Sequence, residues 1–318
     1  MIKTPWRKYS DVMYESVENI SERKKGKIKP IITSWNQFNN LNSGGVEWGI
    51  IVTILSRPGI GKSLILGQIS REIIPLNKEQ DFNILQFQFE MHGMMLAARE
   101  FTSASKIPLI DLYSKGGKPL DEDILHRLKR YVQKQEYRND YIIDKSMSVM
   151  QMADTLDNFW LKHKKPFVCT IDHATLVKKS ASDKTEKDTI DNLYYMLMEK
   201  KKKYPCMFLV LAHLNRTIES AERQKPGNLA NYPCDNDIYG SDGLQKCSDI
   251  QLAFNKPSKY SLGLYGPHKY ILTEADKNLL ACHVLKDRNG HEGGKIHWYE
   301  ALYNEMKIVE RDAPPKRM

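Results

Sequence analysis

Residues 50–74 read IIVTIL, SRPGIGKS and LILGQISREII in succession. The first block has the composition of a buried strand, and the third has apolar residues at helical spacing. A strand, a glycine loop and a helix headed by Lys-Ser form the context of a phosphate-binding P-loop. Backbone N–H groups and the helix N-terminus then face the phosphates, Lys62 supplies positive charge, and Ser63 offers a hydroxyl to Mg2+. We therefore predict a site for ATP and Mg2+ formed by Ser56, Arg57, Pro58, Gly59, Ile60, Gly61, Lys62 and Ser63.

The loop departs from the usual pattern at its first position, where Ser56 replaces glycine. Serine is small, so the change is mild. An ordinary glycine-rich turn is the alternative interpretation, but it leaves the Lys-Ser pair at the head of a helix unexplained. The pattern favours the P-loop.

Further apolar runs follow at fairly even intervals, separated by segments with helical periodicity at 120–135, 150–164 and 189–203. The runs are NILQFQF at 83–89, FVCTI at 167–171, MFLVLA at 207–212, DIQLAF at 249–254 and LLACHVL at 279–285. This alternation is typical of a parallel sheet with crossover helices. We expect an α/β fold: one domain over 31–312 with a mainly parallel central sheet flanked by helices. An N-terminal arm (1–30) precedes it, and a short basic tail (313–318), expected to be disordered, follows.

Two carboxylates lie directly after apolar runs. Asp172, at the end of one run, can orient Mg2+ through its water shell. Glu90, after another, would lie between the P-loop strand and the Asp172 strand if all three are neighbours in the sheet. There it could polarise the water that attacks the γ-phosphate. Alternatively, each is a helix cap or turn residue.

Composition excludes several classes of protein. With 41% hydrophobic and 27% charged residues, the chain of 318 residues is neither disordered nor fibrous. No apolar run is long enough to span a membrane and no signal peptide is evident, so we expect a soluble, cytoplasmic protein. The five cysteines, none in a C-x-x-C pair, indicate neither a disulfide framework nor a zinc site. The net charge of +9 is compatible with a nucleic-acid partner and equally with a solvated surface.

Together these segments resemble the ATPase domain of DnaB-type replicative helicases, hexameric rings built on a RecA-like core, from about Tyr9 to about Val309. The resemblance rests on five motifs: FEMH at 89–92 with LAAR at 96–99, DHATL at 172–176, LAHLNR at 211–216, GSDGLQKCSD at 240–249 and KDRNGHEG at 286–293. Only Asp172 and Leu176 match the family's DYLQL, and Tyr239 stands where an arginine is common. By itself the last motif would be interpreted as a hairpin turn with solvated charges.

The resemblance implies roles for particular residues. Glu90 is the carboxylate that activates water, His213 stands at the position that senses the γ-phosphate, and Arg99 belongs to the nucleotide site. Arg288 is an arginine finger donated by the neighbouring subunit, with Lys286 beside it. The family binds DNA through two loops, which here are 178–188 and 216–241. The candidate phosphate contacts in these loops are Lys178, Lys179, Lys184, Arg223 and Lys225, and Lys246 in the neighbouring motif 240–249 is a further one.

The implied function is ATP-dependent movement along single-stranded DNA, 5′ to 3′, with unwinding of duplex during replication. The implied partners are further copies in a hexameric ring, DNA, and a primase or loader. Only the arm from Lys8 to Arg23, similar to the family's linker helix, precedes the core, which suggests a phage- or plasmid-type relative acting in a host cytoplasm. The helix expected in this arm, near 10–22, packs either on its own domain or on a neighbour. Two other functions stay open: a RecA-like recombinase or clock-type ATPase, and a non-catalytic accessory subunit.

Overall fold

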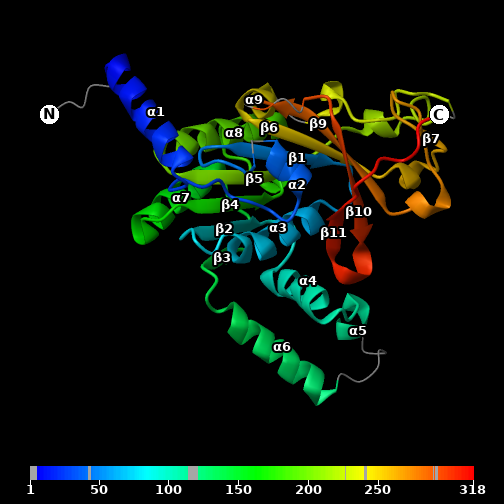
Figure 1. The fold of residues 1–318 in the computed structure, drawn as a ribbon, viewed down its shortest axis with the longest axis horizontal. Helices are drawn as coiled ribbons and strands as arrows, with labels where there is room; N and C mark the ends of the chain where they lie inside the picture. Colours follow the sequence, from blue (N-terminus) through cyan, green and yellow to red (C-terminus); the bar gives the residue numbers. More distant parts are fainter. Residues whose placement is uncertain are drawn as a thin grey trace.

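The computed structural model describes residues 6–41, 44–113, 121–225, 227–239, 242–288, 290 and 293–318. Within them a nine-stranded sheet runs through the molecule in the order β11-β10-β9-β6-β1-β5-β4-β2-β3 (Figure 1). The parallel part consists of β1 (Ile51–Ser56), β2 (Asn83–Gln88), β3 (Asp140–Ile143), β4 (Phe167–Asp172), β5 (Cys206–His213) and β6 (Ile250–Asn255). The antiparallel extension consists of β9 (Leu279–Asp287), β10 (Ile296–Leu302) and β11 (Lys307–Glu310). The mainly parallel sheet and the strand runs predicted from the sequence are confirmed.

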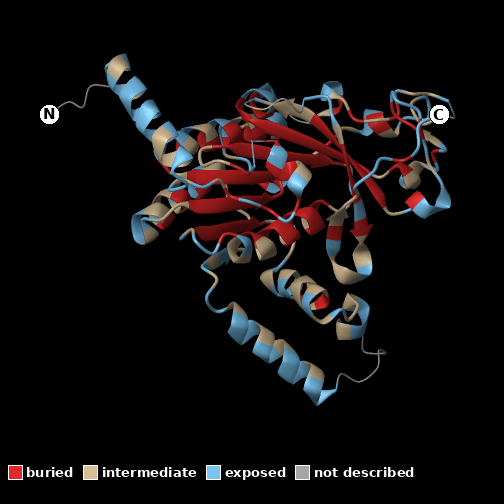
Figure 2. Ribbon diagram, in the orientation of Figure 1, coloured by how far each residue is buried: buried red, intermediate tan, exposed pale blue. Residues whose placement is uncertain are grey.

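Side chains that alternate along the parallel strands fill two separate cores, one on each face of the sheet. Val52 and Ile54 on β1 pack with α3 (Lys62–Leu76), whereas Ile51 and Leu55 face the opposite core. That second core includes residues of α7 (Val149–His163), α8 (Glu186–Lys203) and α9 (Asp242–Cys247). Because both faces are covered, the central strands are buried along their whole length (Figure 2).

The helices α1 (Tyr9–Lys24), α4 (Gly93–Ser105), α5 (Leu109–Tyr113) and α6 (Glu122–Gln135) contribute no residue to these cores. The short α2 (Asn36–Asn40) contributes Phe38 to the first core. α1 and α6 contain no buried residue and project from opposite sides of the body (Figures 1 and 2). None of the helices in the described ranges is long and apolar enough to cross a membrane.

Two expectations about the chain path were wrong. Glu90 does not follow a strand between β1 and β4, because β5 occupies that place and β2 lies on the far side of β4. The tail is ordered: Ile271 N–H donates to the Lys316 carbonyl (2.7 Å) and Met318 N–H to the Lys269 carbonyl (3.0 Å). These bonds satisfy backbone groups at the edge of a small hairpin, β7 (Leu264–Tyr265) with β8 (Tyr270–Ile271), that would otherwise lack partners in the sheet.

A buried histidine on β9 makes stability depend on pH. The Nε2 atom of His283 and the Tyr265 hydroxyl form a hydrogen bond of 2.7 Å. Burial lowers the pKa of His283 to about 3. Its pKa is about 6.5 in an unfolded chain. A group with a depressed folded pKa contributes stability above the unfolded pKa, and this stability is lost as the pH falls towards the folded pKa.

Between pH 6.5 and 4.5, the free energy of unfolding of the wild type should therefore fall more steeply than that of His283→Gln. The difference in slope should approach about 1.4 kcal/mol per pH unit. Urea denaturation at several pH values measures it, with exposed His126→Gln as the control. Parallel slopes for wild type and His283→Gln would contradict the assignment.

Candidate active site

The site lies at the carboxyl ends of the parallel strands, which form one edge of the sheet. The P-loop follows β1, and His213 ends the neighbouring strand β5, paired in register with Ser56. Asp172 ends β4, in register with Gln88 of β2, and Glu90 comes two residues later. Carboxyl ends of parallel strands meet at one edge, so segments far apart in the sequence converge there.

The P-loop conformation requires its glycines. Gly59 and Gly61 have φ values of +79° and +112°, in the left-handed region that residues with a Cβ rarely adopt. α3 begins at Lys62, so its first N–H groups have no carbonyl partner within the helix. The loop is therefore shaped to surround an anion with backbone donors.

Lys62 connects this loop to β5. Its buried Nζ lies 3.2 Å from the Ser56 carbonyl oxygen and 3.2 Å from His213 Nδ1. Burial lowers the pKa of Lys62 to about 8, although the negative charges of Asp172 and Glu90 act in the opposite direction. The ammonium group is still mainly protonated at neutral pH and available to phosphate.

The residues at Asp172 fit a magnesium ion. The Asp172 side chain is buried, the Ser63 hydroxyl donates to it, and its Oδ1 has no hydrogen-bond partner. Burial raises the pKa of Asp172 to about 6, and the positive charge of Arg99 on α4 is among the influences that lower it. An orphaned carboxylate oxygen beside a hydroxyl offers hard oxygen ligands. Mg2+ prefers few protein ligands, with phosphate and water completing the shell.

A row of side chains runs from Glu90 to Lys62. Glu90 Oε2 lies 3.7 Å from His173 Nε2, and the His173 and His213 rings meet edge to face with centroids 4.5 Å apart. Burial lowers the pKa of each histidine to about 4, so both are neutral at pH 7. In the sequence, His173 stands out only as a mismatch to DYLQL. Its position directly after Asp172 was the signal that could have identified it.

A second group of charged side chains, which the sequence did not indicate, lies beside Arg57 and Pro58 of the P-loop. Glu219, on the short 3-10 helix after β5, lies 2.8 Å from both Arg57 Nη2 and Lys259 Nζ, and Lys259 also donates to the Pro58 carbonyl (3.2 Å). Although burial alone would raise it, hydrogen bonds from Arg57 and Lys259 lower the pKa of Glu219 to about 2. This carboxylate ties the P-loop to the segment that begins the second predicted DNA loop.

Lys286 and Arg288 lie at the opposite edge of the sheet, where the parallel strands begin. Arg288 Nη1 is 3.2 Å from Asp249 Oδ1, and Asp249 Oδ2 accepts the Ile51 N–H (2.8 Å) at the start of β1. A strand rises about 3.3 Å per residue, so the start of β1 is on the order of 20 Å from the P-loop at its end. Neither Arg288 nor Lys286 can therefore act on the P-loop of its own chain.

The candidate DNA contacts have different surroundings. Lys178, Lys179, Lys184, Lys225 and Lys246 are exposed. The expectation that Arg223 contacts DNA phosphates was wrong. Its guanidinium pairs with the buried Asp237 and donates to the Ala230 and Tyr232 carbonyls. It organises its own loop. Of the quoted motifs, Gly240, Ser241, Asn289, His291 and Glu292 lie outside the described residues.

Comparisons with known proteins show the family and the fold. The family model of the DnaB-like helicase C terminal domain matches residues 31–305. The fold is similar to a solved ATPase domain of another protein, with a TM-score of 0.77 and 17% identity over 94% of this chain and 99% of that one. It is also similar to a DnaB-like replicative helicase whose structure is described with its interactions with primase. The TM-score there is 0.74, at 17% identity over 94% of this chain and 66% of that one. No curated protein matches the sequence.

At such low identity the solved structures show the fold alone, and this fold is the RecA-like one expected from the sequence. The family match covers most of the chain and includes the P-loop, Glu90, Asp172, His213 and Arg288. The expected resemblance is confirmed: the chain belongs to the DnaB-like helicases, the ATP-hydrolysing replicative ring helicases, and carries their C-terminal domain.

Proposed function

We propose that the chain hydrolyses ATP at the interfaces of a hexameric ring and thereby moves 5′ to 3′ along single-stranded DNA, unwinding duplex during replication. The observation that carries the proposal is the division of the site between two edges of the sheet. Lys62, Ser63, Glu90, Asp172 and His213 meet at one edge, whereas Arg288 is held at the other. A complete site then requires two copies.

Each residue has a part in the proposed reaction. Bound Mg-ATP supplies the γ-phosphoryl group and a cation that neutralises its charge. Lys62 and the P-loop N–H groups bind phosphate oxygens, while Ser63 and Asp172 hold the metal. Glu90 orients water and accepts its proton, and His213 donates a hydrogen bond to the γ-phosphate. The neighbour's Arg288 and Lys286 stabilise the charge that develops in the transition state.

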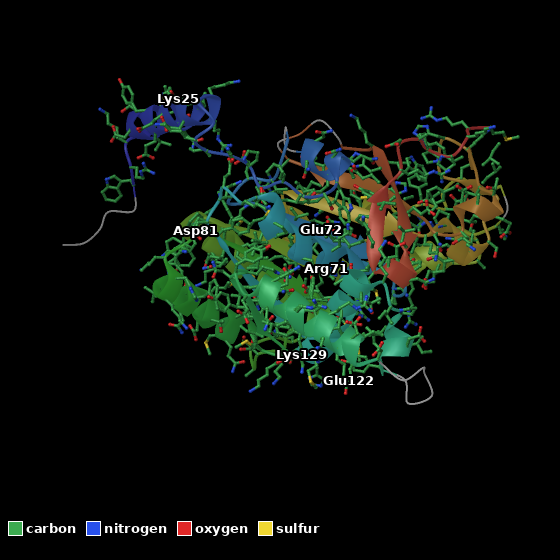
Figure 3. All side chains as sticks on the ribbon, turned by 60° about the horizontal axis from the view of Figure 1, so that its bottom comes forward. Lys25, Arg71, Glu72, Asp81, Glu122 and Lys129 are labelled. Atoms are coloured by element: carbon green, nitrogen blue, oxygen red, sulfur yellow. The ribbon has the colours of Figure 1, made fainter. Side chains whose placement is uncertain are left out.

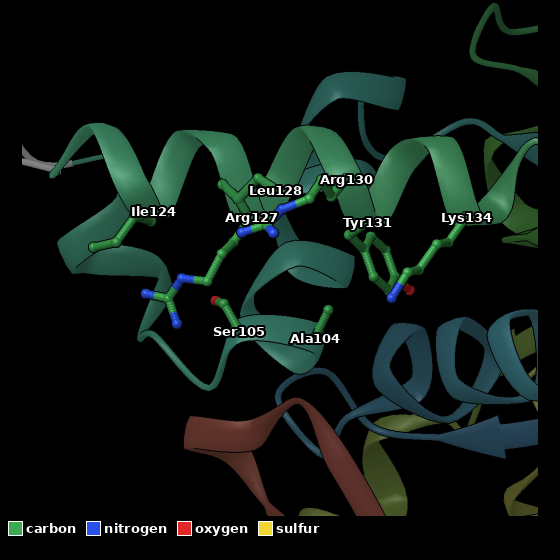
Figure 4. A pocket seen from close by; sticks show the side chains of 8 residues that line it. All are labelled: Ala104, Ser105, Ile124, Arg127, Leu128, Arg130, Tyr131 and Lys134. Atoms are coloured by element: carbon green, nitrogen blue, oxygen red, sulfur yellow. The ribbon is translucent and has the colours of Figure 1, made fainter.

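Two helices with exposed apolar side chains support assembly between copies. Tyr9, Met13, Val17 and Ile20 form an exposed apolar stripe along α1. α6 exposes Leu125 and Val132. A pocket of about 310 Å³ between α4 and α6 is lined by Arg127, Arg130 and Lys134 among others (Figure 4).

α1 carries four acidic and two basic side chains, and α6 the reverse, so their net charges are −2 and +2. α1 and α6 lie far apart in Figure 1, and the labelled residues Lys25, after α1, and Lys129, on α6, lie far apart in Figure 3. α1 therefore cannot cover α6 of its own chain. We propose that α1 docks on α6 of the next copy, a head-to-tail contact that closes into a ring.

Steady-state ATP hydrolysis, measured with and without single-stranded DNA on samples of known size, tests the proposal. We expect DNA to stimulate hydrolysis, and forked duplexes to be unwound when they carry a 5′ tail. Unwinding from a 3′ tail would reverse the polarity. Hydrolysis indifferent to DNA would instead support the recombinase or clock-type alternative, against which the arginine-finger motif after the core argues. A complete lack of hydrolysis would support the non-catalytic accessory subunit.

Exposed lysines in the first loop are the proposed DNA contacts with the clearest test. Lys178 and Lys179 follow β4 and the short 3-10 helix Ala174–Leu176, at the same edge as the active site. Each phosphate contact contributes about 0.7 to the salt slope of single-strand binding. Lys178→Ala/Lys179→Ala should therefore reduce the slope by about 1.4 and weaken binding similarly for all sequences.

Fluorescence anisotropy of labelled DNA at several salt concentrations measures this slope. The matched control is Lys162→Ala/Lys202→Ala, which removes two exposed lysines at the opposite edge of the sheet, where α7 and α8 end. An unchanged slope in the loop variant, or an equal loss in both, would exclude Lys178 and Lys179.

A further inference from the structure

His173 is a buried, neutral imidazole in the active site, and no role for it follows from the family's motif. It follows Asp172 at the end of β4 and is 7% exposed. Its Nδ1 lies 2.7 Å from the Thr175 hydroxyl, its Nε2 faces Glu90, and its ring meets His213. One side chain thus touches both the proposed water-activating carboxylate and the proposed phosphate sensor.

The contacts select one tautomer of His173. A neutral imidazole carries one N–H, and its other nitrogen is an acceptor. If Nδ1 carried the proton, the lone pair of Nε2 would point at the Glu90 carboxylate. If the Thr175 hydroxyl donates to Nδ1, Nε2 carries the proton and presents a donor to that carboxylate. The second arrangement is favourable at both nitrogens, so Thr175 sets His173 as a donor towards Glu90.

Glu90 needs such a partner. It lies in a bend after β2, and half of its side-chain surface is exposed. Among the described residues, no other side chain forms a hydrogen bond or ion pair with its carboxylate; Lys62 and Asp172 act on it only through their charges. The 3.7 Å separation is longer than a hydrogen bond, and such contacts often shorten when substrate binds.

We infer that His173 is a positioning residue for ATP hydrolysis: its Nε2–H holds the Glu90 carboxylate at the reacting water, while its ring buttresses His213. The inference rests on the proposed function, because Glu90 is assigned there. On this inference the chemical step depends on His173, whereas nucleotide binding depends on the P-loop and does not require His173.

Two substitutions at this position test the inference. The amide nitrogen of glutamine reaches about as far as Nε2, whereas that of asparagine reaches only about as far as Nδ1. His173→Asn should lower kcat by about 10- to 100-fold, less than the roughly 10²- to 10⁴-fold contribution of a general base itself, and leave the KM for ATP within about twofold. His173→Gln should recover most of the lost rate. Ring size and thermal unfolding midpoint are measured for each variant.

Thr175→Val supplies a second test that keeps the imidazole. It removes the hydroxyl that selects the tautomer, so kcat should fall in the wild-type background. In the His173→Gln background the same change should have no further effect, since no tautomer remains to be selected. Additive losses would contradict the inference.

Glu90→Gln separates failure of the inference from failure of the proposed function. If Glu90→Gln still hydrolyses ATP at the wild-type rate, the assignment of Glu90 fails. If Glu90→Gln is inactive but His173→Asn keeps full kcat, only the inference fails. The same holds if His173→Asn raises the KM for ATP without lowering kcat, since His173 would then only support the P-loop.

Discussion

A mixture of Arg288→Ala subunits and Lys62→Ala subunits should hydrolyse ATP although neither variant does so alone. Arg288 is held by Asp249 and the Lys246 carbonyl at the opposite edge of the sheet from Lys62. In a mixed ring, some interfaces combine an intact P-loop from an Arg288→Ala subunit with an intact finger from a Lys62→Ala subunit. Those interfaces contain every residue of the proposed site.

The expected effects are large. An arginine finger contributes roughly 10³- to 10⁵-fold to the rate of phosphoryl transfer, so Arg288→Ala alone should lose at least about 10³-fold in kcat. Lys62→Ala should lose both nucleotide affinity and rate, because its ammonium is the buried cation beside the phosphate loop. The measurement is steady-state phosphate release after the two variants have been mixed and allowed to exchange subunits.

A matched control uses the double variant Lys62→Ala/Arg288→Ala. Mixed with Arg288→Ala, it supplies no interface with both groups intact, so this mixture should stay inactive at the same protein concentration and ring size. Full activity of Arg288→Ala by itself would contradict a finger acting between subunits. So would a lack of recovery in a mixture whose subunits are shown to have exchanged.

Val17→Lys should abolish both the ring and ATP hydrolysis, although Val17 is not a residue of the proposed active site. Val17 lies in the exposed apolar stripe of α1. Placing a charge in an apolar contact costs several kcal/mol unless it is paired, and the proposed α6 surface is itself basic. That penalty recurs at each interface. Hydrolysis is lost with the ring because the site is shared.

Light scattering and phosphate release on the same samples measure the outcome. Asn19→Lys is the control, because it adds the same side chain and the same charge to α1 at an exposed position outside the apolar stripe. An exposed charge there changes stability by about 1 kcal/mol or less. Leu125→Lys should reproduce the Val17→Lys result from the other side of the contact. Loss of the ring in Val17→Lys but not in Leu125→Lys would mean that α1 docks somewhere other than α6.

Local features of the site were predictable from the sequence. The P-loop was identified because the strand, the glycine loop and the start of α3 are contiguous, and Gly59 and Gly61 adopt the left-handed conformation that such a loop requires. Asp172 was identified because it ends an apolar run that forms β4. The alternation of apolar runs and helical segments was enough to predict the α/β fold, since both signals are periodic and strong.

What the sequence determined by itself, then, is the set of elements and the residues that carry chemistry at their ends. Only the tertiary structure decided which of those ends meet. Strand order is not written in local periodicity, so the place of β5 between β1 and β4 moved Glu90 away from the position we expected. Contacts between distant segments likewise placed His173 beside His213, paired Arg57 and Lys259 with Glu219, and turned Arg223 from a DNA contact into a loop-organising residue. A further contact between distant segments, the hydrogen bond from the Ile271 N–H to the Lys316 carbonyl, holds the tail on β8. The physical reason is that these interactions join residues far apart in the chain, and their geometry exists only after the sheet has brought its strand ends together.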